Sequence, residues 1–213
     1  MHNAKLIGVY HMSEEENKKN RIMEYSFKKF TSMGISHVTM EEISRGVGIG
    51  KGTLYKFFPS KEALLFATID FVALRIEKKI QEIIADKQLN PAEKLSLVIK
   101  TVGDRLSKIN PAVLSYIERS VPEAYDKIIE VRQRIIMSNI LKLFEEGKNS
   151  GHFEPDMDAY LTAHIVIGAA NHVIGAQVLP TLNYNLDSLM NNVTATILKG
   201  CLTEEGRKSV FNK

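Results

Sequence analysis

Residues 39–58, TMEEISRGVGIGKGTLYKFF, carry the clearest folding signals in the chain. Thr39 and Glu42 have the spacing of a capping box. In that motif the threonine hydroxyl accepts a hydrogen bond from the amide of the third helical residue. The glutamate side chain in turn accepts a hydrogen bond from the backbone amide of the threonine. Both amides would otherwise lack a partner at the start of a helix. The spacing therefore predicts a short helix over residues 40–47.

A second short helix is expected directly after the first. Gly48 stands where a tight turn needs a residue that tolerates a positive φ. Gly50 then opens a helix over residues 51–58, in which Leu54 and Phe58 lie on one face at a spacing of four. Two short helices that are joined by a glycine-bearing turn and pack through apolar inner faces form a helix-turn-helix.

The outer face of the second helix has the residue types that a DNA-reading helix needs. Lys51 and Lys56 can neutralise phosphates, and Tyr55 can donate a hydrogen bond to a phosphate oxygen. Thr53 is small enough to reach a base edge. Gly52 has no Cβ, so the backbone can come close to DNA. This assortment predicts a protein that recognises a DNA sequence.

The distribution of charge supports a polyanionic partner. Residues 17–61 contain nine Lys or Arg and three Asp or Glu, whereas residues 63–213 contain eighteen of each. The formal net charge of +3 therefore comes from one end of the chain. A basic block beside a neutral remainder is typical of nucleic-acid binding.

The segment from about Arg21 to Leu65 resembles the DNA-binding segment of the tetracycline-repressor (TetR) family. The likeness is most specific in the run GIGKGTLYKFF at residues 48–58 and in the SKEAL that follows. Three positions depart from the usual pattern. Gly50 replaces a common Ser or Thr cap, and Ser44 and Gly46 replace common alanines, which predicts a slightly looser first helix.

The resemblance also implies which residues contact DNA. Thr39 would touch a phosphate while it caps its helix, and Lys61 would clamp the flanking DNA backbone. The other matching positions lie on the second helix and would enter the major groove or hold phosphates. The implied DNA-binding residues are Thr39, Lys51, Gly52, Thr53, Tyr55, Lys56 and Lys61.

The rest of the chain is predicted to be helical. Helical patterns are separated by strong stop signals after Pro59, and no β-strand alternation occurs. We expect an all-α fold of about nine helices, with a helix-turn-helix head (residues 13–60) and a helical body (residues 61–203) that binds an effector and dimerises. A long helix from Ser60 to about Lys87 would connect the two, and the tail after Thr203 is expected to be loose.

The last two predicted helices are candidates for self-association. The helix over residues 159–179 is rich in Gly and Ala, and the helix over residues 187–202 has few charges. Small side chains let helices approach closely, so these helices either pair with a second copy of the chain or are simply buried within one copy. The TetR resemblance implies the former, as a four-helix dimer interface.

Several residues of the body are candidates for lining a ligand cavity. His164 and Asn171 are polar groups on an otherwise apolar helix, where they are either hydrogen-bonded core groups or ligand contacts. His164 and His172 lie two turns apart, which is too far for both to hold one metal ion without other ligands, so no metal site is expected. The candidate ligand-binding residues are Phe66, Tyr116, Met137, Tyr160, His164 and Asn171.

Taken with the resemblance, these features predict a homodimeric transcriptional regulator. It would be a repressor that binds a pseudo-palindromic DNA operator and is released by a small, mainly apolar ligand. A regulator that works without a ligand or activates transcription is an alternative. A helical carrier or enzyme is a further alternative, but no nucleophile–base pair, metal cluster or phosphate loop stands out, and no cofactor is expected.

Composition sets the expected compartment. Cys201 is the single cysteine, so an intramolecular disulfide is impossible, and this usage fits a reducing cytoplasm. No apolar run approaches the roughly 20 residues of a membrane span. The sequence thus predicts a cytoplasmic protein that is not in the membrane.

Overall fold

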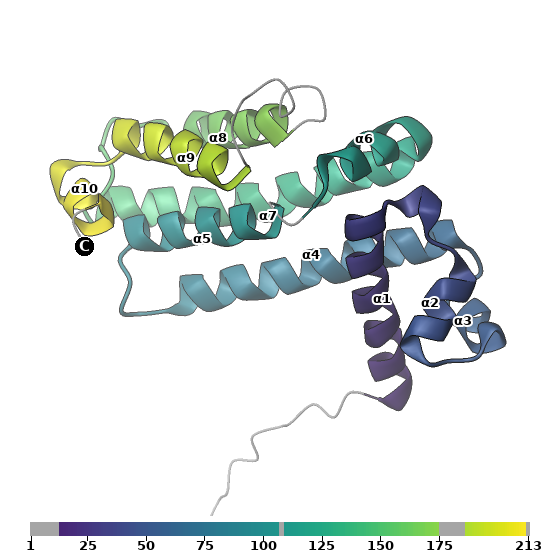
Figure 1. Ribbon diagram of the computed structural model, residues 1–213. Coiled ribbons are helices and arrows are strands. Elements are labelled where there is room, and N and C mark those ends of the chain that lie inside the picture. The colour runs from purple at the N-terminus through teal and green to yellow at the C-terminus, as the bar shows by residue number, and fades with distance from the viewer. Residues whose placement is uncertain (1–12, 107–108, 175–185, 212–213) are drawn as a thin grey trace, which may run out of the picture.

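The computed structural model describes residues 13–106, 109–174 and 186–211, and within these ranges the fold is all-α (Figure 1). These ranges contain ten α-helices and one short 3-10 helix. The helices are α1 (Glu14–Met33), η1 (Ile35–His37), α2 (Met40–Val47), α3 (Lys51–Phe57), α4 (Lys61–Ala85), α5 (Pro91–Leu106), α6 (Pro111–Ser120), α7 (Pro122–Asn149), α8 (Ala159–Ile174), α9 (Leu186–Cys201) and α10 (Glu204–Phe211).

The prediction of a loose tail after Thr203 is wrong, because α10 forms there. The Thr203 hydroxyl accepts the amide of Gly206 at 3.2 Å, which caps the helix, and donates to the carbonyl of Gly151 at 2.7 Å. Gly206 is buried, and an added Cβ would lie 2.2 Å from the carbonyl oxygen of His152. Local capping together with close packing thus orders a segment whose polar composition alone suggests a coil.

Helix α4 connects the head to the body, as predicted. Its side-chain cap is Ser60, whose hydroxyl accepts the amide of Ala63 at 3.0 Å. It begins beside α3 and runs to the far end of the body, and α7 lies alongside it (Figure 1). None of the described helices is long and apolar enough to cross a membrane.

Two hydrophobic clusters form the core. One holds the body helices together around α5, α7, α8 and α9. The other joins the inner faces of α1, α2 and α3 to Val113 and Ile117 of α6 and to Ala124 of α7. Residues beyond position 60 therefore complete the core of the head. The packing shows no boundary between residues 60 and 61, so the predicted division into two domains at this point stays a prediction.

Candidate DNA-binding surface and ligand cavity

The capping box that the sequence predicts is present at the start of α2. The amide of Thr39 donates to the Glu42 carboxylate at 2.7 Å, and the amide of Glu42 donates to the Thr39 hydroxyl at 3.2 Å. The turn after α2 uses Gly48, whose φ of 77° is left-handed. The amide of Ile49 then donates to the carbonyl of Ser44 at 3.0 Å and closes the turn. These local bonds fix where α3 begins.

Helix α3 separates buried from exposed residues in the way a recognition helix requires. Leu54 is fully buried, Phe58 directly after the helix is buried too, and both lie in the same cluster as Ile43 of α2. The remaining side chains of its first two turns face solvent. The exposed residues are Lys51, Gly52, Thr53, Tyr55 and Lys56.

The first exposed lysine of α3 has two partners within the head. Lys51 forms an ion pair with Glu41 of α2, and its Nζ lies 5.8 Å from the centre of the Tyr55 ring. The hydrogen bond from Lys51 lowers the pKa of the Glu41 carboxyl from its ordinary value, and the same bond raises the pKa of Lys51. Both side chains are exposed, so the pair is weak and leaves Lys51 available to a phosphate.

Lys61 has a structural partner that the sequence did not reveal. Its Nζ donates to the carbonyls of Ile35 at 3.0 Å and Val38 at 3.2 Å, across the segment that joins α1 to α2. The side chain is half-buried. Lys61 therefore ties the start of α4 to the head, whatever contact it makes with DNA.

Close packing explains one departure from the family pattern. A Cβ added to Gly46 would lie 2.0 Å from the hydroxyl oxygen of Tyr25, so α1 places this tyrosine directly over α2. Arg21, one turn earlier on α1, donates to the carbonyl of Val47 at 3.2 Å. Neither residue was predicted to hold α2, because the partner positions lie more than twenty residues away in sequence.

A mainly apolar cavity of about 160 Å³ lies where the head meets the body. Its walls come from α1 of the head, from α4 to α7 of the body and from Ile109 between α5 and α6. The side chains from α1 and η1 are Phe27, Phe30, Thr31 and Ile35; those from α4 are Leu65, Thr68, Ile69, Val72, Ala73 and Ile76. The remaining lining residues are Val102, Ile109, Val113, Leu114, Ile117, Ile128, Val131, Arg132 and Ile135.

The ligand candidates drawn from the sequence lie elsewhere. Phe66 and Tyr116 are half-buried against the head cluster, and Met137 packs on the body cluster. Tyr160 and His164 are exposed on α8, with ring centres 4.3 Å apart and the His164 Nδ1 3.0 Å from the Tyr160 carbonyl oxygen. None of these five lines the cavity. The side chains of Asn171 and His172 fall outside the described part of the structure.

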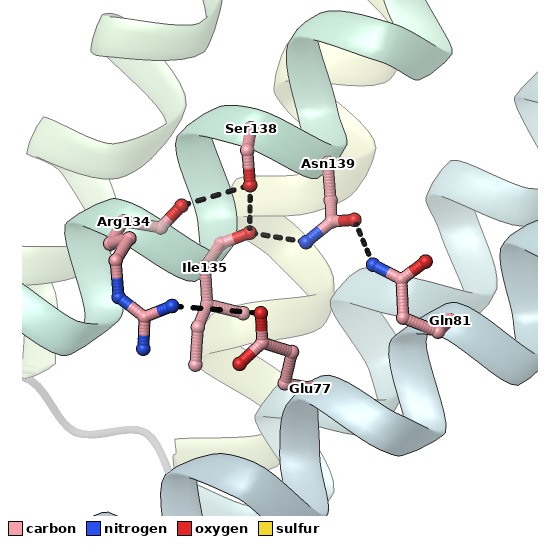
Figure 2. A network of polar contacts seen from close by, with 6 residues as sticks. All are labelled: Glu77, Gln81, Arg134, Ile135, Ser138 and Asn139. Carbon is pink, nitrogen blue, oxygen red and sulfur yellow. Dashed lines mark hydrogen bonds and ion pairs between the residues drawn. The ribbon is translucent and has the colours of Figure 1, made fainter.

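Polar contacts join α4 to α7, and we call them the α4–α7 seam. Figure 2 shows the Gln81 amide donating to the Asn139 side-chain oxygen at 2.9 Å, while the buried Asn139 amide donates to the Ile135 carbonyl at 2.6 Å. Glu77 and Arg134 form an ion pair at 3.6 Å (Figure 2). The last contact of the seam pairs Asp70 with Lys127 at 2.9 Å.

Helix α8 exposes several large apolar side chains. Tyr160, Leu161 and Ile165 are 63%, 57% and 53% exposed. Gly168, on the next turn, has open space where a Cβ would lie. Exposed apolar side chains that gather on one helix are typical of surfaces that contact another molecule. The part of the predicted helix beyond Ile174 lies outside the described residues.

Two family profiles together cover most of the chain. Residues 22–68 match the profile described as bacterial regulatory proteins, tetR family. Residues 71–200 match the profile described as YsiA-like protein, C-terminal region. The boundary between the two profiles falls inside α4, the helix that connects the head to the body.

Similar proteins share nearly the full length of the chain. It is 25% identical over 197 residues to the fatty acid metabolism regulator protein of Bacillus subtilis (strain 168), which covers 89% of this chain and 98% of that protein. The structure of FadR from Bacillus subtilis in complex with stearoyl-CoA matches with a TM-score of 0.60 at 20% identity, over 84% of this chain and 97% of that one. The ketosteroid transcriptional regulator KstR2 of Mycobacterium tuberculosis matches with a TM-score of 0.59 at 18% identity, over 88% and 96%.

Proposed function

The chain belongs to the TetR family of bacterial regulatory proteins, and from this premise we propose that it is a homodimeric repressor that an elongated, mainly apolar effector releases from its operator. The family makes it a DNA-binding transcriptional regulator and not an enzyme. A regulator of this kind acts where the DNA is, so we place it in the cytoplasm.

The DNA contact is assigned to α3 and the residues that flank the helix-turn-helix. Lys51, Gly52, Thr53, Tyr55 and Lys56 are exposed on one short helix, and the surrounding segment has a strong excess of positive charge. Thr39 and Lys61 would contact the phosphates on either side. Phosphate contacts fix the position of the helix, and contacts to base edges supply the sequence preference.

The dimer is assigned to α8 and α9. The exposed apolar side chains of α8 support a partner helix, and α9 packs beside α8. Since α10 follows α9, the proposed interface is formed by the two helices before the last one. A two-fold dimer presents two copies of α3, so its operator would be pseudo-palindromic, with half-sites about one helical turn apart (~34–36 Å) or somewhat more.

One observation carries the proposal of ligand release: the cavity is lined by the head and the body together. Phe27 and Phe30 of α1 face the same space as Val72 of α4 and Ile128 of α7. A molecule in this space therefore contacts both the DNA-binding unit and the helices that would set its position. The relative that is named for fatty acid metabolism and the neighbour bound to stearoyl-CoA support a lipid-like effector.

The size of the cavity suggests how binding would be coupled to release. About 160 Å³ is close to the size of an engineered cavity that binds benzene, and ligand sites are usually larger. A long acyl chain is larger than this space, so we propose that its binding pushes α4 and α7 apart. Because α4 is a continuous helix of 25 residues, its displacement would swing the head as a unit. Two heads that change separation no longer fit successive major grooves.

The test is the affinity of the full-length protein for an operator selected from random DNA, with and without stearoyl-CoA. Coupling of typical size predicts a loss of about 5- to 150-fold. Val72→Phe fills the cavity and should reduce this effect to less than about twofold, because the ligand no longer has room. Leu74→Phe makes a similar addition at an exposed position of the same helix and should leave the ligand effect intact.

Three results would contradict the proposal. An operator affinity that does not change at saturating stearoyl-CoA would remove this class of effector. An effect of equal size in Val72→Phe would place the ligand outside the cavity. Tighter DNA binding in the presence of the ligand would favour a ligand-activated binder over a repressor that is released.

A further inference from the structure

Lys61, the first residue of α4, holds the segment that leads into α2. Its Nζ donates to the carbonyl of Ile35 at 3.0 Å and to the carbonyl of Val38 at 3.2 Å. The side chains of Ile35 and Val38 are both buried in the cluster that forms the core of the head. The two carbonyls therefore belong to a well-packed segment, and the ammonium group of Lys61 connects the start of α4 to it.

The peptide unit between Val38 and Thr39 is hydrogen-bonded at both ends. The carbonyl oxygen of Val38 and the amide N–H of Thr39 lie in one rigid plane, because the peptide bond is planar. Lys61 donates to the oxygen, and the N–H donates to the carboxylate of Glu42 at 2.7 Å. A cation at the oxygen and an anion at the N–H polarise the unit in the same direction, which strengthens both bonds. The orientation of this plane is thus set jointly by α4 and α2.

This peptide plane determines where the N-terminus of α2 lies. Thr39 is the N-cap of α2, and its hydroxyl accepts the amide of Glu42 at 3.2 Å and donates to the carboxylate of the same residue at 3.0 Å. The first amides of a helix have no acceptor within that helix, so they can donate to an anion such as a phosphate. Thr39 is exposed at this end of α2. Rotation of the plane would move the threonine and these amides together.

We propose that Lys61 is a positioning residue for operator binding: it holds the peptide between Val38 and Thr39 and so keeps the N-terminus of α2 in place for a phosphate. This inference rests on the proposed function for the contact of Thr39 with DNA. It gives Lys61 a role besides its own contact with DNA, since an ammonium group has three hydrogens and the two carbonyls use two of them.

The experiment compares two lysine variants of the full-length protein on an operator selected from random DNA. Lys61→Met and Lys56→Met each remove one charge from the head, and Lys56 is exposed on α3. Both should lower the slope of log affinity against log salt by about one unit per chain. Lys61→Met should lower the affinity about 5- to 10-fold further than Lys56→Met, because it also releases the N-terminus of α2. We call this further loss the excess loss.

Two more variants show whether the excess loss passes through α2. Thr39→Val removes the hydroxyl, and in its background the excess loss should disappear, because a support has no effect once the supported contact is gone. Lys61→Gln removes the charge but keeps an N–H donor on a side chain one bond shorter. It should recover part of the excess loss, whereas a purely electrostatic role predicts that Lys61→Gln and Lys61→Met bind the operator equally.

A measurement without DNA tests the positioning directly. Amide hydrogen exchange, followed by mass spectrometry, should be faster over residues 35–42 in Lys61→Met than in wild-type protein, because the segment loses two hydrogen bonds. Lys56→Met should leave the exchange of residues 35–42 unchanged. A lysine that acts only on phosphates has no effect on exchange in the free protein.

The outcomes distinguish this inference from the proposed function. Equal losses of affinity in Lys61→Met and Lys56→Met would overturn the inference, and so would unchanged exchange over residues 35–42. Additive free energies for Lys61→Met and Thr39→Val would also overturn it, because Lys61 would then act independently of the cap. If Thr39→Val alone leaves operator affinity unchanged, the proposed contact of Thr39 is wrong and the inference falls with it. If Lys61→Met does not fold, the comparison of Lys61→Gln with Lys56→Gln decides by the same criteria.

Discussion

The head and the body place their functional groups in opposite ways. The head carries its proposed DNA contacts on the outside of α3, a helix of seven residues whose position is fixed by neighbours within the same short segment. The proposed ligand site is internal instead: it is a cavity between the body and α1 of the head, with walls from five α-helices spread over more than one hundred residues. A surface site of this kind depends on local geometry, whereas the cavity exists only because distant helices pack imperfectly.

This difference has an energetic side. Charged and hydroxyl groups on α3 cost little in the free protein because water solvates them. The walls of the cavity are almost all apolar, so an apolar ligand would bury surface there without leaving polar groups unpaired. The head is therefore suited to contact a polyanion at its surface, and the cavity is suited to enclose an apolar molecule.

The largest effect should come from removing phosphate contacts of the head. Lys51→Ala with Lys56→Ala should lower the slope of log affinity against log salt by about two units per chain, or four per dimer. At about 0.15 M salt this corresponds to a loss of roughly 100- to 1,000-fold in operator affinity. Fluorescence anisotropy over a salt series measures both numbers.

A body variant serves as the control for this experiment. Lys142→Ala removes an exposed lysine of α7 and should leave the slope unchanged. A slope that the double variant does not alter would show that α3 does not lie on the phosphate backbone.

Contacts between residues that are close in sequence can be predicted from the sequence, and contacts between distant helices cannot. The capping box of Thr39 and the burial of Leu54 could be predicted because their partners lie within a few residues. The carbonyl partners of Lys61 and the tyrosine over Gly46 could not, since each depends on how α1 packs against later helices. In the head, sequence reasoning missed tertiary contacts of this kind, including the bond from Arg21 to the Val47 carbonyl.

In the body, the residues that matter look ordinary in the sequence. The cavity-lining positions of α4 have the same apolar spacing as its core positions. Periodicity therefore cannot distinguish a residue that lines a cavity from one that is packed in the core. Lys127, Arg132 and Arg134 all read as surface charges on α7. Only the packing shows that two of them face acids of α4 and one faces the cavity. The predicted candidate His164 was chosen for its polarity, and α8 exposes it together with the candidate Tyr160.

The second largest effect should come from the proposed dimer surface. Leu161→Glu with Ile165→Glu places two charges on the exposed patch of α8, where a partner helix would bury them. We expect the dimer to weaken by at least about 30-fold, which corresponds to about 2 kcal/mol for loss of a central apolar contact. Analytical ultracentrifugation measures the dimer constant directly.

The matched change is Leu74→Glu, which adds a charge at an exposed leucine of α4 away from α8. It should leave the dimer intact. If both proteins remain equally dimeric, then α8 is not the interface, and the apolar patch needs another partner.

A smaller effect on operator affinity is expected when the same substitution, glycine to alanine, is made in the head and in the body. Gly52→Ala in α3 and Gly200→Ala in α9 each add a Cβ that meets no atom within 4 Å. Alanine favours a helix over glycine by up to about 1 kcal/mol, so both variants should melt at a slightly higher temperature. Only Gly52→Ala should weaken operator binding, by about fivefold, because its methyl group stands between the backbone and DNA. Equal operator affinities would mean that α3 does not approach DNA at this position.

The smallest predicted effect concerns the ion pair that holds Lys51 in the free head. DNA must compete with Glu41 for this lysine, and a carboxylate near the phosphates also repels them. Glu41→Gln removes both effects and should strengthen operator binding by about two- to fourfold, because exposed ion pairs are weak.

The hydrogen bond from Lys51 lowers the pKa of Glu41, so the carboxylate stays charged below its ordinary titration range. The advantage of the variant should therefore be the same at about pH 7 and about pH 5.5. Anisotropy at the two pH values, with Glu145→Gln on α7 as a control for general charge removal, measures this. Weaker binding by Glu41→Gln would instead show that Glu41 positions Lys51 for its contact with DNA, and the head would then be preorganised by its ion pair.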